Sequence, residues 1–168
     1  AHLSKAGPSG ELSVNDATDI DEFRVELLQF DEIVEQAAAW GNDVWWSKAD
    51  VRNGYRAVGL AQHRWHQQVY VWKQKFYVDC RLTMGHRSSA FLFSTVTAAA
   101  EWIIQRRCDR HPDVGPNGAM VRTYIDDFIV LGRSKSRARA ATAIMLDTLS
   151  ELGVPLAEEK TVQMRQRS

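Results

Sequence analysis

The chain has 168 residues, of which 45% are apolar, and its 21 lysines and arginines balance 21 aspartates and glutamates. This size and composition are typical of one globular domain with its own core, and the sequence has neither an apolar run of about 18 residues nor a basic-then-apolar leader, so it predicts no membrane span and no secretion. The two cysteines, Cys80 and Cys108, are too few for a disulfide framework and lack metal-ligand spacing, so we interpret them as buried thiols in an intracellular compartment, cytoplasmic or nuclear.

The first part of the chain is predicted to contain a loop, a helix and a strand. Residues 1–19 carry a Gly-Pro-Ser-Gly run and few large apolar groups, which is typical of a loop, whereas 20–168 are predicted to form the folded domain. From Phe30 the apolar residues recur at i, i+3, i+4 and i+7 with acidic residues opposite, which predicts an amphipathic helix ending near Trp40. Residues 44–46 follow as a short buried strand.

The middle of the chain is predicted to form a hairpin and then a helix. Apolar and polar residues alternate over 69–82 on either side of a polar turn at 73–75. After Gly85, a serine can cap a helix that continues toward Pro112. Because apolar residues occupy much of the circumference of this helix, we expect it to be largely buried.

The last part of the chain is predicted to form a second hairpin, a helix and a strand. Residues 120–131 are two apolar stretches around Asp126 and Asp127, 136–152 have helical periodicity, and 161–164 are typical of a strand. The complete order of elements favours an α+β fold in which helices pack on one face of a mainly antiparallel sheet.

The two adjacent aspartates form the first candidate for chemistry. Asp126 and Asp127 repel each other at a tight turn where Asn-Gly or Asp-Gly would be conformationally more favourable, so a cation is expected to offset the repulsion. A harmless, solvent-exposed turn is the alternative. Asp50 follows the predicted strand at 44–46, and if that strand lies beside the second hairpin, three carboxylates converge. Such hard oxygen ligands suit Mg²⁺, and two such ions support in-line phosphoryl transfer.

Four ordered motifs resemble those of the reverse transcriptases. They are a YxDD signature at 124–127, an aspartate followed five residues later by an aromatic residue at 50–55, a glycine-containing segment with its helix at 81–93, and a motif near a lysine at 152–161. The residues within these motifs are most similar to those of the reverse transcriptases of DIRS-type retrotransposons, which encode a tyrosine recombinase. The resemblance covers about residues 13–162 and implies that the α+β fold is a polymerase palm.

The resemblance also implies a metal site. Asp50 and Asp126 correspond to the principal ligands of two Mg²⁺ ions, for which Mn²⁺ can substitute. The Val51 carbonyl would assist, and Asp127 would complete the acidic cluster. Lys160 corresponds to a residue near the triphosphate that can protonate the departing pyrophosphate. A solvated surface lysine is the alternative at that position.

A second set of residues is implied to bind the nucleotide. Backbone amides near Asn53 and Gly54 would meet phosphate oxygens, and the Tyr55 ring would lie beneath the deoxyribose and exclude a 2′-hydroxyl by its shape. Gly85 would allow close approach of the backbone to the nucleotide, against which Met84 would pack. For Tyr55, an ordinary place in the core is the alternative.

The function implied by these motifs is that of an RNA-directed DNA polymerase palm. A primer 3′-hydroxyl on an RNA or DNA template would attack a deoxynucleoside triphosphate (dNTP). Basic residues before Asp50 are few and eight residues follow Lys160, so we expect the fingers and thumb to come from other parts of a larger polyprotein and this fragment to be weak or inactive alone. The alternative is a domesticated, non-catalytic domain that binds RNA or protein, although a pure scaffold would have no use for three uncompensated acids.

The balanced net charge divides into two unlike parts. Residues 1–50 hold 3 basic and 11 acidic side chains, a net of −8, whereas 51–168 hold 18 basic and 10 acidic ones, a net of +8. A positive portion of this kind attracts polyanions, and ordinary solvated surface charge is the alternative. Three arginines near a predicted helix end, Arg106, Arg107 and Arg110, either complement the helix dipole or contact phosphates.

Overall fold

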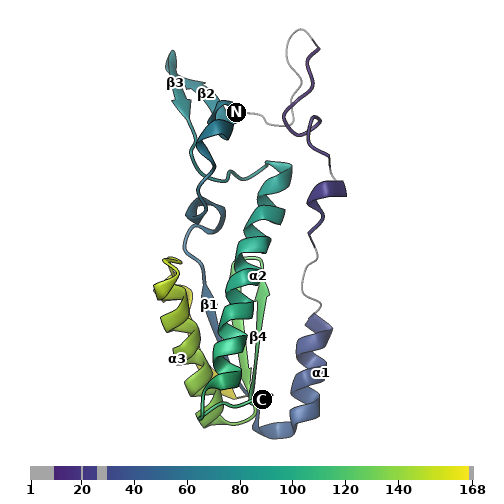
Figure 1. The fold of residues 1–168 in the computed structure, drawn as a ribbon, viewed down its shortest axis with the longest axis vertical. Coiled ribbons are helices and arrows are strands. Elements are labelled where there is room, and N and C mark those ends of the chain that lie inside the picture. The colour runs from purple at the N-terminus through teal and green to yellow at the C-terminus, as the bar shows by residue number, and fades with distance from the viewer. Residues whose placement is uncertain (1–9, 20, 26–29, 167–168) are drawn as a thin grey trace. The chain divides into compact units, whose positions relative to one another are not determined.

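The computed structural model describes residues 10–19, 21–25 and 30–166, with side chains described as far as residue 161 (Figure 1). The chain divides into two compact units. We call Ala1–Val25 with Asn53–Thr95 the hairpin unit, and Glu26–Arg52 with Val96–Ser168 the sheet unit. None of the helices in the described ranges is both long and apolar enough to cross a membrane.

The sheet unit contains four antiparallel strands in the order β4-β5-β1-β6. The strands are β1 (Trp45–Asp50), β4 (Ala119–Tyr124), β5 (Asp127–Gly132) and β6 (Val162–Gln166). The helices are α1 (Phe30–Trp40), α2 (Arg87–Arg110), which begins in the hairpin unit, and α3 (Lys135–Glu151). The expected order of elements and the α+β class are confirmed.

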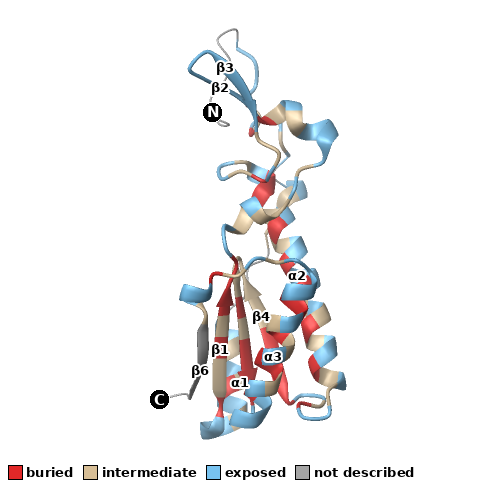
Figure 2. Ribbon diagram, turned by 90° about the vertical axis from the view of Figure 1, so that its left-hand side faces the viewer, coloured by how far each residue is buried: buried red, intermediate tan, exposed pale blue. Residues whose placement is uncertain are grey.

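One face of the sheet forms the main core. Four residues of β1 and β5 that point to this face have no exposed surface, and they are Ser47, Ala49, Phe128 and Val130. α3 packs against both strands, and the Ser47 hydroxyl lies 2.7 Å from the Thr142 hydroxyl of α3. α3 itself begins at Ser134, whose side chain accepts a hydrogen bond from the Arg137 amide, as an N-cap should. Figure 2 shows these buried stretches of β1 beside α3.

The opposite face of the sheet is covered by α1, so the prediction that the helices pack on one face of the sheet is wrong for this helix. The Phe30 ring lies 5.0 Å from the Tyr124 ring, and Glu32 forms an ion pair of 3.4 Å with Arg122. Further along the helix, Ala37 belongs to an apolar cluster with residues of β4 and β5. Because side chains alternate along a strand, the contacts of α1 and those of α3 lie on opposite faces of the sheet.

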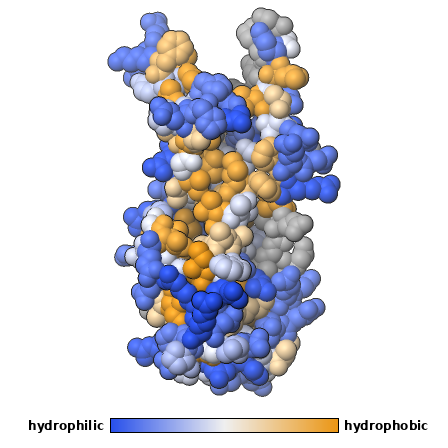
Figure 3. Space-filling view, viewed as in Figure 1, coloured by the Kyte–Doolittle hydropathy of each residue, from blue (hydrophilic) through white to orange (hydrophobic). Residues whose placement is uncertain are grey.

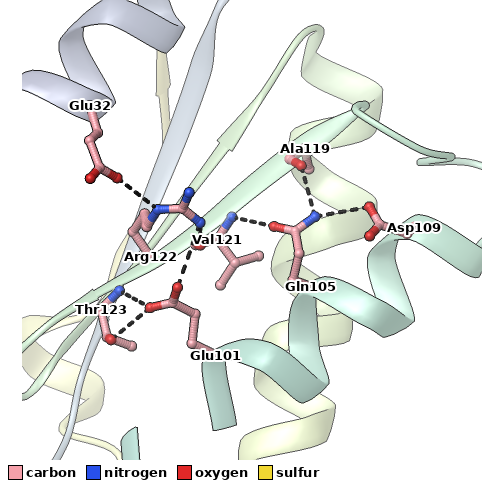
Figure 4. A network of polar contacts seen from close by, with 8 residues as sticks. All are labelled: Glu32, Glu101, Gln105, Asp109, Ala119, Val121, Arg122 and Thr123. Atoms are coloured by element: carbon pink, nitrogen blue, oxygen red, sulfur yellow. Dashed lines mark hydrogen bonds and ion pairs between the residues drawn. The ribbon is translucent and has the colours of Figure 1, made fainter. Parts of the chain in front are cut away.

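The edge strand β4 has its backbone groups bound by side chains of α2 (Figure 4). Gln105 accepts a hydrogen bond of 2.8 Å from the Val121 amide and donates one of 3.1 Å to the Ala119 carbonyl, as a neighbouring strand would. Glu101 accepts bonds of 2.7 Å from both the amide and the hydroxyl of Thr123. These contacts satisfy donors that an open sheet edge would leave available to another chain.

The hairpin unit contains β2 (Val69–Trp72) and β3 (Lys75–Val78). The predicted hairpin is therefore correct, but its second strand ends at Val78 and not near residue 82. Beyond that point the chain joins other segments, since the Asp79 amide donates to the Gln68 carbonyl and Arg81 forms an isolated bridge with Gly59.

The expectation that α2 is largely buried is wrong for one side of the helix. Leu92, Val96 and Trp102 are 37%, 45% and 62% exposed, and Figure 3 shows hydrophobic surface over α2. The guanidinium of Arg106 lies 5.2 Å from the centre of the Trp102 ring, which is within cation–π range. Cys108 on the other side of the helix is buried.

Candidate catalytic site

The turn between β4 and β5 holds Asp126. The turn consists of Ile125 and Asp126, and Asp127 is already the first residue of β5. Ile125 has a φ of 55°, which lies in the left-handed region that β-branched residues rarely adopt. Backbone strain of this kind persists only where the surrounding structure enforces it, and it is frequent at functional sites.

Asp50 and Asp127 face each other across β1 and β5. They are direct partners in the antiparallel register, so their side chains project from the same face of the sheet with Cβ atoms about 5 Å apart. Asp50 is only 7% exposed. Two carboxylates in this arrangement repel each other and need a cation nearby.

Backbone hydrogen bonds fix the ends of these strands. The Val51 amide donates to the Asp126 carbonyl at 2.8 Å, which ties the turn to the end of β1. The Ala157 amide donates to the Asp50 carbonyl at 2.9 Å, and Val51 also forms a bridge with Leu156. The segment before Lys160 is thereby held against the strand that carries Asp50.

Two lysines compensate the two carboxylates. The Lys48 ammonium lies 2.7 Å from Asp127 Oδ2, and the Lys160 ammonium lies 3.6 Å from Asp50 Oδ1. The sequence motifs predicted a functional role for Lys160 but none for Lys48. The signal for Lys48 was its spacing, because a residue two positions before Asp50 in a strand points to the same face.

The donors at this site suit a hard cation such as Mg²⁺. Asp127 Oδ1 is buried and has no hydrogen-bond partner in the described part of the chain, and a carboxylate oxygen in that state favours a bound cation. Among the described residues, however, no group of three or more His, Cys, Asp or Glu side chains is gathered for a metal. The two facing carboxylates thus fit a divalent ion as partial ligands. The predicted convergence of three carboxylates is not found among the described residues.

The residues expected to bind the nucleotide belong to the hairpin unit. The Tyr55 ring meets the Phe93 ring edge-on at 5.3 Å and is partly buried. Asn53 and Gly54 have positive φ values of 62° and 35°, so the chain turns sharply just before Tyr55. Met84 is 84% exposed, which leaves its side chain free to contact another molecule.

A side-chain network holds the glycine-containing segment. Gly85 has a φ of 88°, which requires glycine, and its carbonyl accepts a 2.7 Å hydrogen bond from the Asn15 side chain. The Asn15 side chain also accepts a bond of 3.1 Å from the Arg87 amide, and Arg87 donates to the Asn15 carbonyl at 2.6 Å. Asn15 therefore positions the start of α2, a role that no local pattern in the sequence indicated.

Comparisons with known proteins agree with this fold. The family model described as reverse transcriptase (RNA-dependent DNA polymerase) matches residues 13–168. The foamy viral protease-reverse transcriptase dRH in complex with double-stranded DNA matches 98% of this chain, with 18% identity and a TM-score of 0.70. The same foamy viral protein with an RNA/DNA hybrid matches 70% of this chain, with 20% identity and a TM-score of 0.58.

These comparisons also show how much of a longer protein the chain represents. The native prototype foamy virus protease-reverse transcriptase matches 94% of this chain at 17% identity, with a TM-score of 0.59. This chain spans only 27%, 14% and 20% of the three solved structures. No curated protein matches it. The expected palm-like fold is confirmed, since the likeness extends over nearly the whole chain.

Proposed function

Because the chain belongs to the reverse transcriptase family, we propose that it is the palm of an RNA-directed DNA polymerase. The observation that carries this proposal is the facing pair of Asp50 and Asp127 beside the turn that holds Asp126. We further propose that 1–19 form a loop, that 20–168 form the palm, and that fingers and thumb come from a larger polyprotein. The residues within the motifs support a DIRS-type retrotransposon as its source.

Members of this family use divalent metal ions, and we propose two Mg²⁺ ions here, with Mn²⁺ as a substitute. Asp50 and Asp126 would be the main ligands, and Asp127 and the Val51 carbonyl would complete the site. When bound, the ions would activate the primer 3′-hydroxyl and stabilise the departing pyrophosphate. Since Lys160 lies 3.6 Å from Asp50 Oδ1 and is 64% exposed, it can move toward a triphosphate that arrives with the metal.

For the substrate side we propose the residues of the hairpin unit that the motifs indicate. Asn53 and Gly54 would offer backbone amides to the triphosphate, and Met84 and Gly85 would meet the nucleotide itself. Tyr55 would select the sugar. Its edge-on contact with Phe93 supports this role, because a ring fixed by a neighbour cannot turn aside for a 2′-hydroxyl.

A second candidate function is a non-catalytic domain that binds RNA or protein. The two lysines favour it, because Lys48 and Lys160 already offset the negative charges of Asp127 and Asp50 without a metal. The acids are then structural partners of the lysines and need no other explanation.

A metal titration separates these two functions. The thermal unfolding midpoint of the 168-residue chain is measured in EDTA, Mg²⁺ and Mn²⁺. For a polymerase palm we expect both ions to raise the midpoint and Asp126→Asn to remove the increase. Asp147→Asn is the matched control, since Asp147 is an exposed acid of α3 and should leave the response intact.

Primer extension on an RNA template provides the activity test. With Mg²⁺ and dNTPs we expect weak synthesis or none from this chain, and any synthesis should disappear in Asp126→Asn but not in Asp147→Asn. If neither ion changes the midpoint in a manner that depends on Asp126, the non-catalytic domain is the better description. Robust synthesis by the chain alone would show that fingers and thumb are not required.

A further inference from the structure

The hairpin of β2 and β3 exposes an unusual amount of apolar surface. Seven large hydrophobic side chains in eight strand residues are between 40% and 79% exposed, and they are Val69, Tyr70, Val71, Trp72, Phe76, Tyr77 and Val78. Both strands appear as exposed in Figure 2. Isolated surface hydrophobics need no explanation, but a contiguous set of this kind usually marks an interaction surface.

The base of this hairpin is firmly held, so the exposure is not a sign of a loose segment. The Asp79 amide donates to the Gln68 carbonyl at 3.0 Å, and the Asp79 carboxylate forms an ion pair with Arg56. The Leu60 amide donates to the Cys80 carbonyl at 2.8 Å. The two strands therefore project from an ordered base.

The two faces of the hairpin differ in chemistry. In the strand register Tyr70 pairs with Tyr77 and Trp72 pairs with Lys75, so these four share one face, which we call the aromatic face. The other face, which we call the aliphatic face, carries Val69, Val71, Phe76 and Val78. On the aromatic face, the rings of Tyr70 and Tyr77 stack with centroids 5.5 Å apart and planes 18° apart.

The net positive charge of residues 53–95 favours a negatively charged binding partner. Residues 53–95 contain six lysines and arginines and one acid, a net of +5, and that acid is Asp79, which Arg56 already pairs. At the tip of the hairpin Lys73 and Gln74 have φ values of 47° and 59°, a turn in which Asn-Gly is far more favourable. A lysine placed there at a conformational cost points to a use for its charge.

We propose that the aromatic face is a binding platform for single-stranded nucleic acid. Unpaired bases would stack on Trp72 and on the tyrosine pair, and the adjoining phosphates would lie against Lys73 and Lys75. Aromatic rings beside cations without acids are the usual composition of such platforms, which tolerate any base because every base has a π-face. The aliphatic face has no cation and suits protein instead. This inference rests on the proposed function, because in a polymerase the bound strand would be the template.

Fluorescence anisotropy with the 168-residue chain tests the platform. A labelled 12-nucleotide oligo(U) and the matching oligo(dT) are titrated with the chain in EDTA, so that neither metal nor catalysis is needed. Trp72→Ala and Tyr77→Ala are each expected to weaken binding at least about five-fold. This factor is the lower limit of the affinity that the stacking of one base on one aromatic ring contributes. Trp72→Phe should retain most of the affinity.

Phe76→Ala is the matched control. Phe76 is the most exposed ring of the same hairpin, at 79%, but lies on the aliphatic face, so its loss should change the affinity less than two-fold. Lys73→Gln should reduce the slope of log affinity against log salt by about 0.7, the value for one phosphate contact on a single strand. Circular dichroism checks that each variant remains folded.

Several results would overturn the proposal. They are no binding, an equal or larger effect of Phe76→Ala, tighter binding of a duplex than of a single strand, or capture of a protein by the aromatic face in place of the oligonucleotide. A failure of the platform proposal can be told apart from a failure of the proposed polymerase function. If Mn²⁺ still raises the unfolding midpoint through Asp126 while the hairpin variants bind normally, only the platform is rejected. If the hairpin variants lose binding while the metal response is absent, only the polymerase function is rejected.

Discussion

The Lys48 ammonium lies 2.7 Å from Asp127 Oδ2, on the sheet face where Asp127 is the direct partner of Asp50. The lysine therefore supplies the positive charge that two facing carboxylates require. A divalent ion supplies the same charge. We therefore expect a bound divalent ion to replace part of the electrostatic stabilisation that Lys48 provides.

Lys48→Met should destabilise the metal-free protein, because it removes the cation and leaves Asp127 facing Asp50. Since both partners of the ion pair are less than a third exposed, we expect a loss of about 1–2 kcal/mol in the free energy of unfolding. Urea denaturation in EDTA measures it. With Mg²⁺ at millimolar concentration, part of the loss should be recovered.

The control for this experiment is Arg52→Gln. Arg52 forms an exposed ion pair of 3.6 Å with Glu159, so its loss should change the free energy of unfolding by less than about 0.5 kcal/mol, with or without metal. A destabilisation by Lys48→Met that is the same in EDTA and in Mg²⁺ would contradict a shared role of lysine and metal.

Gln105→Met tests the protection of the β4 edge. Methionine has a similar volume but cannot bond the Val121 amide or the Ala119 carbonyl, so both groups lose their partner. We expect a loss of about 1–3 kcal/mol in the free energy of unfolding and faster hydrogen exchange at the Val121 amide. The Val130 amide, within the sheet, serves as the internal reference, and unchanged exchange at Val121 would show that Gln105 is dispensable.

The sequence predicted most elements because their periodicity is local. The apolar stretches around Asp126 and Asp127 became β4 and β5, and the spacing of apolar residues from Phe30 predicted a helix ending near Trp40, where α1 ends. The turn was predicted at the two aspartates and lies one residue earlier, because Ile125 adopts a φ of 55° that its residue type disfavours. Local propensity cannot foresee a conformation that the surrounding fold imposes.

The parts that the sequence did not predict depend on contacts between distant segments. Gln105 bonds a strand 16 residues away, and Asn15 bonds Arg87 across 72 residues. Neither residue belongs to a pattern with a recognisable spacing. The exposed side of α2 was also missed, because apolar content alone does not reveal which side of a helix is covered.

Thiol titration checks the burial of the cysteines. Burial, with a smaller contribution from the nearby charge of Asp109, raises the pKa of Cys108 to about 12, so its thiol stays protonated and unreactive at pH 8. Cys80 is only partly buried, so the prediction that both thiols are buried is wrong for this residue. We expect Ellman's reagent to modify one thiol in the native chain and two in denaturant, and Cys80→Ser to abolish the native reaction. Rapid native modification of both thiols would contradict the packing of α2.

The last prediction concerns His86, which precedes α2. Partial burial lowers the pKa of this imidazole below its ordinary value of 6.5, because the charged form loses hydration. Its Nδ1 atom lies 2.8 Å from the Ser88 hydroxyl. The unfolded chain therefore binds a proton at a higher pH than the folded chain does, and stability is lost as the pH falls from about 6.5 toward the lowered pKa.

Urea denaturation at several pH values between 7.5 and 5 measures this effect. The free energy of unfolding should decline below pH 6.5, and His86→Asn should make the decline shallower, because asparagine keeps a polar partner for Ser88 but does not titrate. His63→Asn is the matched control, since His63 is exposed and its removal should leave the slope unchanged. If His86→Asn and His63→Asn alter the slope equally, the burial of His86 does not govern the acid response.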